Sequence, residues 1–309
     1  MSDSAADKRV DIAICVASRR RPHGLHALLG GIGSQTFRAA APSVRVFVAD
    51  NDAAGSARPV VEDARAWHPY PIAYCVEPRF GIPQARNAAL AEALGCATWI
   101  AFVDDDEVPA PGWLDALLCE QRRSAADVVT GPAVPRFVQP PPRWITEGGF
   151  FAAARRRSGA VLQSAYTNNA LVRASALLAL EMLFDPRMVP MGEDTELFER
   201  LARRGHRIVW ADDAVVYDDV PPERATLRWL LRRSFRSGRA RTRIGRLHAA
   251  RERAGSVVAH SARCLVRGAL RSMAARREST GQRATGLVLA AYGAGRLAEL
   301  AGRPGEPGR

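Results

Sequence analysis

The chain has 309 residues, of which 47% are hydrophobic and 25% charged, so it can bury a large core, and disorder throughout is excluded. Its formal net charge of +12 is unevenly distributed, because residues 221–309 contain 20 arginines and five glutamates, whereas the preceding residues contain 24 basic and 27 acidic side chains. Basic charge therefore belongs to the C-terminal part alone, which weighs against a nucleic-acid-binding surface on the rest of the chain.

Short apolar runs alternate with helical patterns over the first hundred residues. The pattern predicts strands at Val10–Ala17, Val44–Ala49, Ile72–Val76 and Trp99–Val103, with helices between them at Pro22–Gly33, Arg58–Trp67 and Pro83–Leu94. Connections of this length favour an α/β fold with a mainly parallel sheet and helices on both of its faces. In such sheets, ligands bind beyond the carboxyl ends of the strands.

The next hundred residues are less regular. They predict helices near Pro111–Arg122, with Pro111 in the first turn, and near Thr195–Arg204. They also predict strands at Val128–Val134, Ala170–Val172, Arg207–Trp210 and Ala214–Tyr217. The segment Pro135–Arg143 contains three successive prolines, so we expect an ordered loop or lid there. Beyond Pro221, the pattern is helical and rich in arginine.

Polar residues follow the first three predicted strands, at the edge where such sheets bind ligands. Ala17, Ser18 and Arg19 offer backbone N–H groups and positive charge to an anion, although Ser18 also suits a helix cap. Asp50 is suited to accept hydrogen bonds from a base or a ribose, but aspartate is also an ordinary turn residue. Arg86 is equally suited to a phosphate and to a solvated helix surface.

An acidic cluster ends the fourth predicted strand. It consists of Asp104, Asp105, Asp106 and Glu107, directly after the apolar run Trp99–Val103. Adjacent carboxylates repel one another, and a divalent cation with oxygen ligands relieves that repulsion. A solvated loop is the alternative to a metal site, and we expect Glu107 to face solvent.

In this order, the motifs resemble those of the bacterial family 2 glycosyltransferases, which have the GT-A fold. The resemblance covers about residues 9–240 and rests on Ser18-Arg-Arg-Arg-Pro22, Val48-Ala-Asp50-Asn51, Gly81-x4-Arg86-Asn87, Phe102-Val-Asp104-Asp-Asp106 and Gly192-Glu193-Asp194-Thr195-Glu196. Four segments are similar to the succinoglycan-type exopolysaccharide glucosyltransferases: Asp50-Asn-Asp-Ala-Ala-Gly55, Glu77-Pro-Arg-Phe-Gly-Ile82, Asp104-Asp-Asp-Glu-Val-Pro109 and Thr167-Asn-Asn169.

The resemblance implies inverting, metal-dependent transfer of a hexose from a nucleoside-diphosphate sugar, usually UDP-linked, to a saccharide or lipid-linked saccharide acceptor. The implied donor-binding residues are Ala17, Ser18, Arg19, Asp50, Arg86, Asp104 and Asp105. Asp104 and Asp106 would hold Mg²⁺ or Mn²⁺, and Asp194 would be the catalytic base. Candidates for the acceptor site or for a loop over the donor are Trp144, Glu193, Arg236 and Arg239. Glu193 and Asp194 also suit a helix N-terminus without any catalytic role.

We expect three parts in the chain: a nucleotide-sugar-binding half at residues 9–134, an acceptor-side half at 135–240 and a basic amphipathic helical extension at 241–309. The extension either packs on the enzyme or attaches to an anionic membrane surface. A nucleotidyltransferase is one alternative, although it usually has a glycine-rich phosphate loop after the first strand. A nucleic-acid-binding protein that uses the basic helices is the other, but few aromatic residues interrupt the arginines, and we expect no nucleic-acid partner.

The cysteines and the first residues of the chain indicate in which cellular compartment the protein is expected. The five cysteines are odd in number and include no Cys-x-x-Cys pair, which is typical of reduced thiols. The first residues lack an apolar signal region, and no apolar stretch approaches the roughly 20 residues of a membrane span. We therefore expect a cytoplasmic protein, peripheral at the inner face of the plasma membrane if the extension binds lipid.

Overall fold

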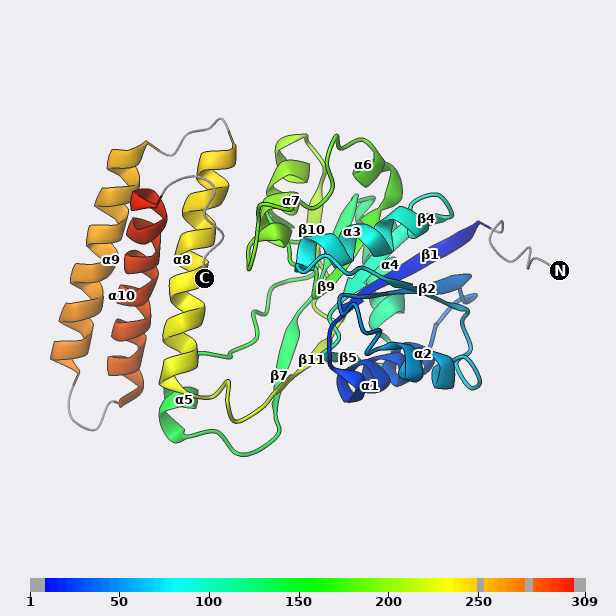
Figure 1. Ribbon diagram of the computed structural model, residues 1–309, viewed down its shortest axis with the longest axis horizontal. Coiled ribbons are helices and arrows are strands. Elements are labelled where there is room, and N and C mark those ends of the chain that lie inside the picture. Colours follow the sequence, from blue (N-terminus) through cyan, green and yellow to red (C-terminus); the bar gives the residue numbers. More distant parts are fainter. Residues whose placement is uncertain (1–8, 249–252, 276–279, 303–309) are drawn as a thin grey trace. The chain divides into compact units, whose positions relative to one another are not determined.

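A computed structural model describes residues 9–248, 253–275 and 280–302 (Figure 1). The strands are β1 (Val10–Ser18), β2 (Val44–Asp50), β3 (Ile72–Val76), β4 (Ala97–Val103), β5 (Glu107–Pro109), β6 (Val128–Thr130), β7 (Ala133–Phe137), β8 (Val161–Leu162), β9 (Asn169–Arg173), β10 (Ile208–Trp210) and β11 (Val216–Val220). The helices are α1 (Pro22–Gly33), α2 (Arg58–Ala64), α3 (Ile82–Ala93), α4 (Trp113–Ser124), α5 (Arg143–Glu147), α6 (Ala174–Leu178), α7 (Glu193–Arg203), α8 (Leu227–Leu247), α9 (Ala254–Ala274) and α10 (Thr280–Ala301).

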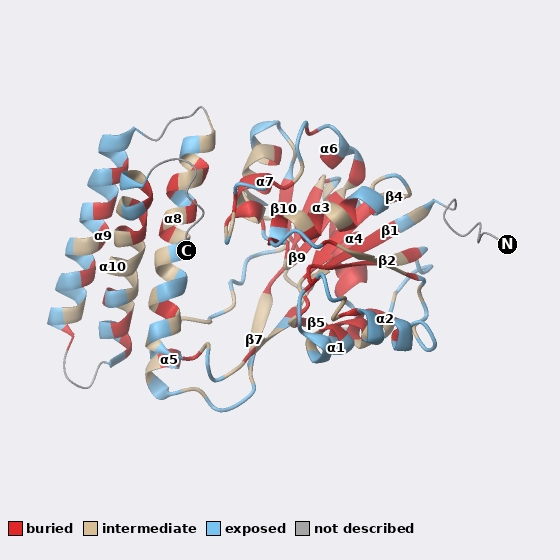
Figure 2. Cartoon of the chain, viewed as in Figure 1, coloured by how far each residue is buried: buried red, intermediate tan, exposed pale blue. Residues whose placement is uncertain are grey.

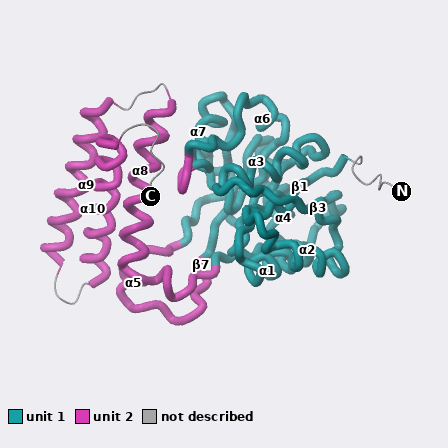
Figure 3. The backbone as a smooth tube through the Cα atoms, viewed as in Figure 1, with its two compact units in different colours: residues 1–134, 153–187, 193–218 teal, residues 135–152, 188–192, 219–309 magenta. Residues whose placement is uncertain are grey.

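The contacts between residues divide the chain into two units, which Figure 3 shows in different colours. Unit 1 comprises residues 1–134, 153–187 and 193–218, and unit 2 comprises residues 135–152, 188–192 and 219–309. Unit 1 holds the main sheet and every residue of the acidic cluster. Unit 2 is mainly helical.

The main sheet has eight strands in the order β3-β2-β1-β4-β9-β6-β10-β8. β1 pairs parallel with β2 and β4, β2 pairs parallel with β3, and β6 pairs parallel with β10. β9 is antiparallel to both of its neighbours, β4 and β6. The predicted mainly parallel α/β sheet is therefore confirmed, with β9 inserted in the opposite direction and the edge strand β8 antiparallel to β10.

Apolar side chains alternate between the two faces of this sheet. Along β1, Ile12, Ile14 and Val16 contribute to a core cluster with α1 and α4, while Ala13 and Cys15 contribute to a second cluster with α3 and α7. This alternation follows from the two-residue period of a strand. Because both faces are covered, the central strands β1, β2, β4 and β9 are mainly apolar and mostly buried, as Figure 2 shows, whereas β3 and β8 at the ends of the sheet are more exposed.

Three local predictions around the acidic cluster and the proline-rich segment were wrong. Glu107 does not face solvent: it begins β5, which pairs with β11, and it is 3% exposed. The strand predicted at Val128–Val134 is two strands, β6 and β7, and Pro135 lies within β7 instead of in a loop. A proline is tolerated there because β7 is an edge strand of the small sheet β5-β11-β7.

Helix α1 packs closely against the backbone of the acidic cluster. A Cβ atom added to Gly24 would lie 2.3 Å from the carbonyl oxygen of Asp105, whereas one added to Gly30, on the same helix, would meet nothing within 4 Å. We expect Gly24→Ala to lower the free energy of unfolding, because backbone must move, and Gly30→Ala to raise it by up to about 1 kcal/mol through helix propensity. Urea unfolding of both variants checks this, and equal effects would contradict the close packing.

In unit 2, α10 packs against both α8 and α9 through small residues. A Cβ on Gly295 would lie 2.0 Å from the carbonyl oxygen of Phe235 on α8, and one on Gly293 would lie 2.8 Å from that of Ser261 on α9. Helix α8 runs without a break across residue 240, where the sequence suggested that the extension begins. None of the helices in the described part of the chain is long and apolar enough to cross a membrane.

Candidate active site

The acidic cluster lies where the carboxyl end of β4 meets the loop between β1 and α1. Asp105 is 5% exposed, and its carboxylate accepts hydrogen bonds from Arg21 Nη1 at 2.8 Å and from the backbone N–H of Arg19 at 3.4 Å. Arg21 also pairs with Asp106 at 3.1 Å. Burial raises the pKa of Asp105, and the charge of Arg21 opposes that effect. Sequence reasoning named Arg19 at this loop and missed Arg21, although both stand in the same Ser-Arg-Arg-Arg run.

Asp50 organises the loop between β2 and α2. It is fully buried, and its Oδ2 accepts hydrogen bonds from the backbone N–H of Ala57 at 2.7 Å and from the Tyr74 hydroxyl at 3.0 Å. Its Oδ1 accepts from the backbone N–H of Asp52 at 3.1 Å. These contacts account for its burial, so its role toward a base stays a prediction. Ser18, also buried, ends β1 directly opposite Asp50 in the parallel ladder.

Arg86 joins the acidic cluster to the start of α7. Its Nη2 donates to Asp104 Oδ1 at 2.8 Å, and its Nη1 donates to Glu193 Oε1. The Arg86 side chain is 8% exposed. Although burial lowers it, the pKa of Arg86 is raised on balance by the carboxylates of Asp104, Glu193 and Asp194. The guanidinium therefore carries permanent positive charge between carboxylates that lie about ninety residues apart in the sequence.

Glu193 and Asp194 occupy the first turn of α7. Burial raises the pKa of Glu193 to about 7, against the opposing charge of Arg86. Burial also raises the pKa of Asp194, and Arg86 again opposes it. Gly192, just before them, has a φ of +101°, which favours glycine and explains the first position of the Gly-Glu-Asp motif. A half-buried carboxylate with a raised pKa at this edge is suited to accept a proton.

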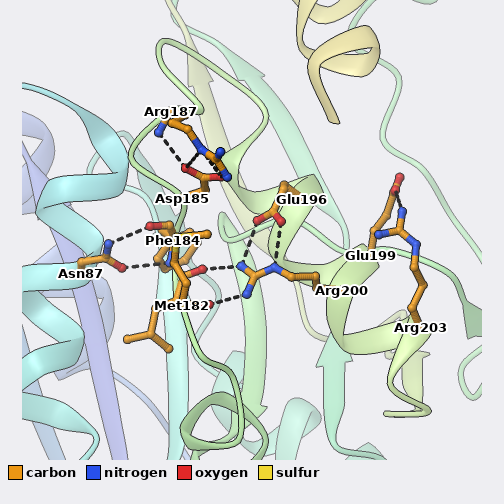
Figure 4. A network of polar contacts seen from close by, with 10 residues as sticks. Asn87, Met182, Phe184, Asp185, Arg187, Glu196, Glu199, Arg200 and Arg203 are labelled. Carbon is orange, nitrogen blue, oxygen red and sulfur yellow. Dashed lines mark hydrogen bonds and ion pairs between the residues drawn. The ribbon is translucent and has the colours of Figure 1, made fainter. Parts of the chain in front are cut away.

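A network of polar contacts fixes the loop that leads toward α7, as Figure 4 shows. Asn87 on α3 donates from Nδ2 to the carbonyl oxygen of Phe184 at 2.8 Å and accepts from the Phe184 backbone N–H at 3.0 Å. Arg200 on α7 pairs with Glu196 at 2.8 Å and donates to the carbonyl oxygens of Met182 and Leu183. Asn87, the last residue of the Gly81-x4-Arg86-Asn87 motif, therefore holds a neighbouring loop, and α3 and α7 are tied to the same segment.

The buried Glu107 holds a second motif near the cluster. Its Oε1 accepts a hydrogen bond from Asn168 Nδ2 at 2.8 Å, and burial raises its pKa well above the ordinary value. Asn169 accepts from the Trp113 indole N–H at 2.8 Å and donates to the carbonyl oxygen of Ala214 at 2.7 Å. The Thr-Asn-Asn motif thus connects β9 to the acidic cluster and to α4. The sequence did contain a signal for the burial of Glu107: the short segment Glu107-Val-Pro109, which follows the aspartates, has the composition of a strand.

The acidic cluster offers two partly exposed carboxylates to a cation. The side chains of Asp104 and Asp106 are 37% and 23% exposed. In the described residues, no group of three or more His, Cys, Asp or Glu side chains is arranged to hold a metal. Mg²⁺ and Mn²⁺ prefer oxygen ligands, and Mg²⁺ is usually bound by one or two carboxylates together with substrate phosphates. The residues present fit a metal that binds together with a nucleotide.

The remaining candidates lie in unit 2. Trp144 on α5 is half-buried and packs edge-on against Phe150, with ring centroids 5.7 Å apart. Arg239 on α8 pairs with Glu299 on α10 at 2.8 Å, and Arg236 is exposed. The Arg239 contact stabilises the packing of α8 on α10, so its part in donor or acceptor binding, like that of Trp144 and Arg236, stays a prediction.

Comparison with known sequences identifies the family. A family model described as glycosyl transferase family 2 matches residues 13–180, and one described as glycosyl transferase family group 2 matches residues 99–275. The succinoglycan biosynthesis protein ExoM of Rhizobium meliloti (strain 1021) is 36% identical over 236 residues, which are 76% of this chain and 74% of that protein. A pre-mycofactocin glycosyltransferase of Mycobacterium tuberculosis is 29% identical over 74% of this chain, which spans 47% of that relative.

Solved structures agree at the level of the fold. The mannosyltransferase PcManGT from Pyrobaculum calidifontis, in complex with GDP-Man and Mn²⁺, has a TM-score of 0.63 at 19% identity and covers 94% of this chain and 88% of its own. TarS of S. aureus, in complex with UDP, has a TM-score of 0.56 at 14% identity, and the match covers 96% of this chain and 93% of the TarS chain. The central sheet and the helices that flank it form a GT-A glycosyltransferase fold, and the C-terminal helices follow this fold in the chain. The predicted resemblance is confirmed, and the chain belongs to glycosyl transferase family 2.

Proposed function

We propose that the chain is an inverting, metal-dependent hexosyltransferase that uses a nucleoside-diphosphate sugar, UDP-linked, and a saccharide or lipid-linked saccharide acceptor in exopolysaccharide or cell-surface glycan synthesis. The observation that carries this proposal is the Arg86 bridge. It connects Asp104, at the end of β4, with Glu193 in the first turn of α7, so that the carboxylate of Asp194 lies at the same edge of the sheet as the acidic cluster.

In the proposed reaction, the Asp194 carboxylate takes the proton of the acceptor hydroxyl. The hydroxyl oxygen forms a bond to the anomeric carbon of the donor while the bond from that carbon to the diphosphate oxygen breaks, which inverts the configuration. A divalent cation held by Asp104 and Asp106 would offset the charge that develops on the leaving diphosphate. Arg86, held between Asp104 and Glu193, keeps the two acidic segments at a fixed spacing and favours the ionised form of Asp194.

The choice of donor rests on sequence resemblance and on what similar proteins bind. TarS of S. aureus is solved with UDP and with UDP-GlcNAc, and PcManGT with GDP-Man and Mn²⁺. The 36% identical relative is named for succinoglycan biosynthesis, which supports a polysaccharide or its lipid-linked precursor as acceptor. We further propose that residues 9–134 bind the donor, that 135–240 contribute to the acceptor side, and that the protein acts at the cytoplasmic face of the membrane.

A thermal-shift screen of UDP, GDP and their sugars, with and without Mn²⁺, tests this proposal. Occupancy of the folded state at a hundred times the dissociation constant adds about 2.7 kcal/mol, so we expect UDP with Mn²⁺ to raise the melting temperature, and EDTA to remove most of the gain. Asp106→Asn should lose the Mn²⁺-dependent part of the increase in melting temperature. Asp213→Asn, at an exposed position of unit 1, should retain it. A wild-type protein that responds to no nucleotide would contradict the proposal.

A further inference from the structure

Helix α9 carries an apolar stripe that nothing in the described chain covers. The exposed fractions of its large apolar side chains are 47% for Val258, 58% for Val266, 56% for Leu270 and 71% for Met273. At 100° per residue, these four lie within an arc of roughly 120° on one face of the helix. Ala262 and Ala269 are exposed within the same arc. Such a continuous exposed apolar stripe indicates a surface that becomes buried against a partner when the protein functions.

The opposite face of α9 packs against α10. Cys264 and Ser261 are buried where α9 passes Gly293 of α10, and Gly268 approaches the Gly286 carbonyl oxygen closely. Figure 2 shows the exposed residues of α9 along the side turned away from α10. The apolar stripe is therefore additional to the packing that stabilises unit 2.

Three arginines run along the helix beside the stripe, each one residue after a stripe residue and therefore about 100° further round the helix. Arg263, Arg267 and Arg271 recur every four residues, all three are exposed, and none forms an ion pair with another described residue. The helix contains no acidic residue between positions 254 and 274. An apolar face bordered by uncompensated arginines matches the chemistry of the boundary between lipid headgroups and acyl chains, where phosphates meet hydrocarbon.

We propose that α9 docks on an anionic lipid surface, with the stripe inserted at the level of the first acyl carbons and the arginines on the lipid phosphates. A second copy of the chain is a poorer occupant, because two α9 helices face to face would bring arginines together without acidic partners. The inference rests on α9 alone and is independent of the donor chemistry proposed above.

Sedimentation of the full-length protein with vesicles tests the proposal. We expect binding to vesicles of equal parts phosphatidylglycerol and phosphatidylcholine, little binding to pure phosphatidylcholine, and weakening as salt rises. Replacing Arg263, Arg267 and Arg271 together by Gln should reduce the partition coefficient by about fivefold per arginine at low salt. The double variant Val266→Ser/Leu270→Ser should reduce binding further in high salt, where the apolar contribution dominates.

Matched variants elsewhere control for net charge and exposed apolar area. Arg9→Gln, Arg122→Gln and Arg157→Gln, combined, remove the same charge from exposed positions of unit 1. Val138→Ser/Leu178→Ser removes side chains that are 63% and 62% exposed. Both controls should bind as the wild type does. Three outcomes overturn the proposal: wild-type protein that ignores anionic vesicles, α9 variants that bind like the wild type, or controls that lose as much binding as the α9 variants.

Two further measurements distinguish lipid binding from self-association and from donor binding. A wild-type dimer that the α9 double variant converts to monomer, with no vesicle binding by either, would assign the stripe to a second copy and overturn the lipid assignment. Nucleotide-dependent thermal shifts should be equal in the wild type and the α9 variants, because none of the substituted residues is a candidate for donor or acceptor binding. Failure of the nucleotide screen would leave the lipid result unaffected.

Discussion

Asp194→Asn is expected to lower the rate of sugar transfer by about 10²–10⁴-fold, the usual contribution of a positioned general base. The substitution preserves the shape of the side chain and an oxygen to accept from the backbone N–H of Thr195. Folding and donor binding should therefore survive. Steady-state rates with an active donor and acceptor pair, together with the nucleotide thermal shift of the variant, measure both effects. Glu199→Gln on the same helix removes a carboxylate from the Arg203 ion pair and should leave the rate nearly unchanged.

The pH dependence of transfer follows from the same residue. A base works when it is deprotonated, and burial raises the pKa of Asp194 above its ordinary value of 3.8. The rate should therefore fall as the pH is lowered through this raised pKa, at a higher pH than an exposed aspartate would produce. Transfer by Asp194→Asn at the wild-type rate, or an acid limb at the position of an ordinary aspartate, would contradict the assignment of the base.

Arg86→Met is expected to lower the free energy of unfolding by about 3–5 kcal/mol, the usual cost of removing one partner of a buried ion pair. The methionine leaves Glu193, which is 4% exposed, without its cationic partner. Urea unfolding measures the loss. Arg143→Met is the matched control, because the Arg143 side chain is 91% exposed in its pair with Glu147, and such exposed helix pairs contribute about 0.3–0.5 kcal/mol.

A second substitution separates the bridge from simple loss of packing. In the Arg86→Met background, Glu193→Gln removes the unpaired carboxylate and should recover part of the lost stability. Arg86→Met should also move the acid limb of the rate profile to higher pH, since Arg86 lowers the pKa of Asp194. A loss of stability no greater than that of Arg143→Met, or an unchanged profile, would show that Arg86 does not couple the two acidic segments.

The first hundred residues of the fold were predictable because their signals are local. Strands β1 to β4 and helices α1 and α3 lie where the apolar periodicity and the Pro and Gly signals placed them. The less regular second half was harder. Pro135 is accepted in β7 only because this strand lies at the edge of a sheet whose partner, β11, comes eighty residues later in the chain.

For the candidate site, too, the features with local signals were predicted and those that depend on distant segments were missed. Asp104, Asp106 and Asp194 were named from short motifs at the ends of predicted elements, and the structure gathers the two motifs at the same end of the fold. The burial of Glu107 was missed because four consecutive acidic residues look like a solvated loop. Its burial depends on pairing with β11 and on a hydrogen bond from Asn168, and both partners are distant in sequence.

The sequence alone determined the α/β class, the order of the first elements, the family and the acidic residues to which we assign the chemistry, because periodicity and motifs are properties of neighbouring residues. Only the tertiary structure decided that Arg86 spans Asp104 and Glu193, that Arg21 pairs with Asp105 and Asp106, and that α9 leaves an apolar stripe beside exposed arginines. These features depend on which distant segments meet and which faces stay uncovered. The free energy of long-range packing decides both, and no local pattern records it.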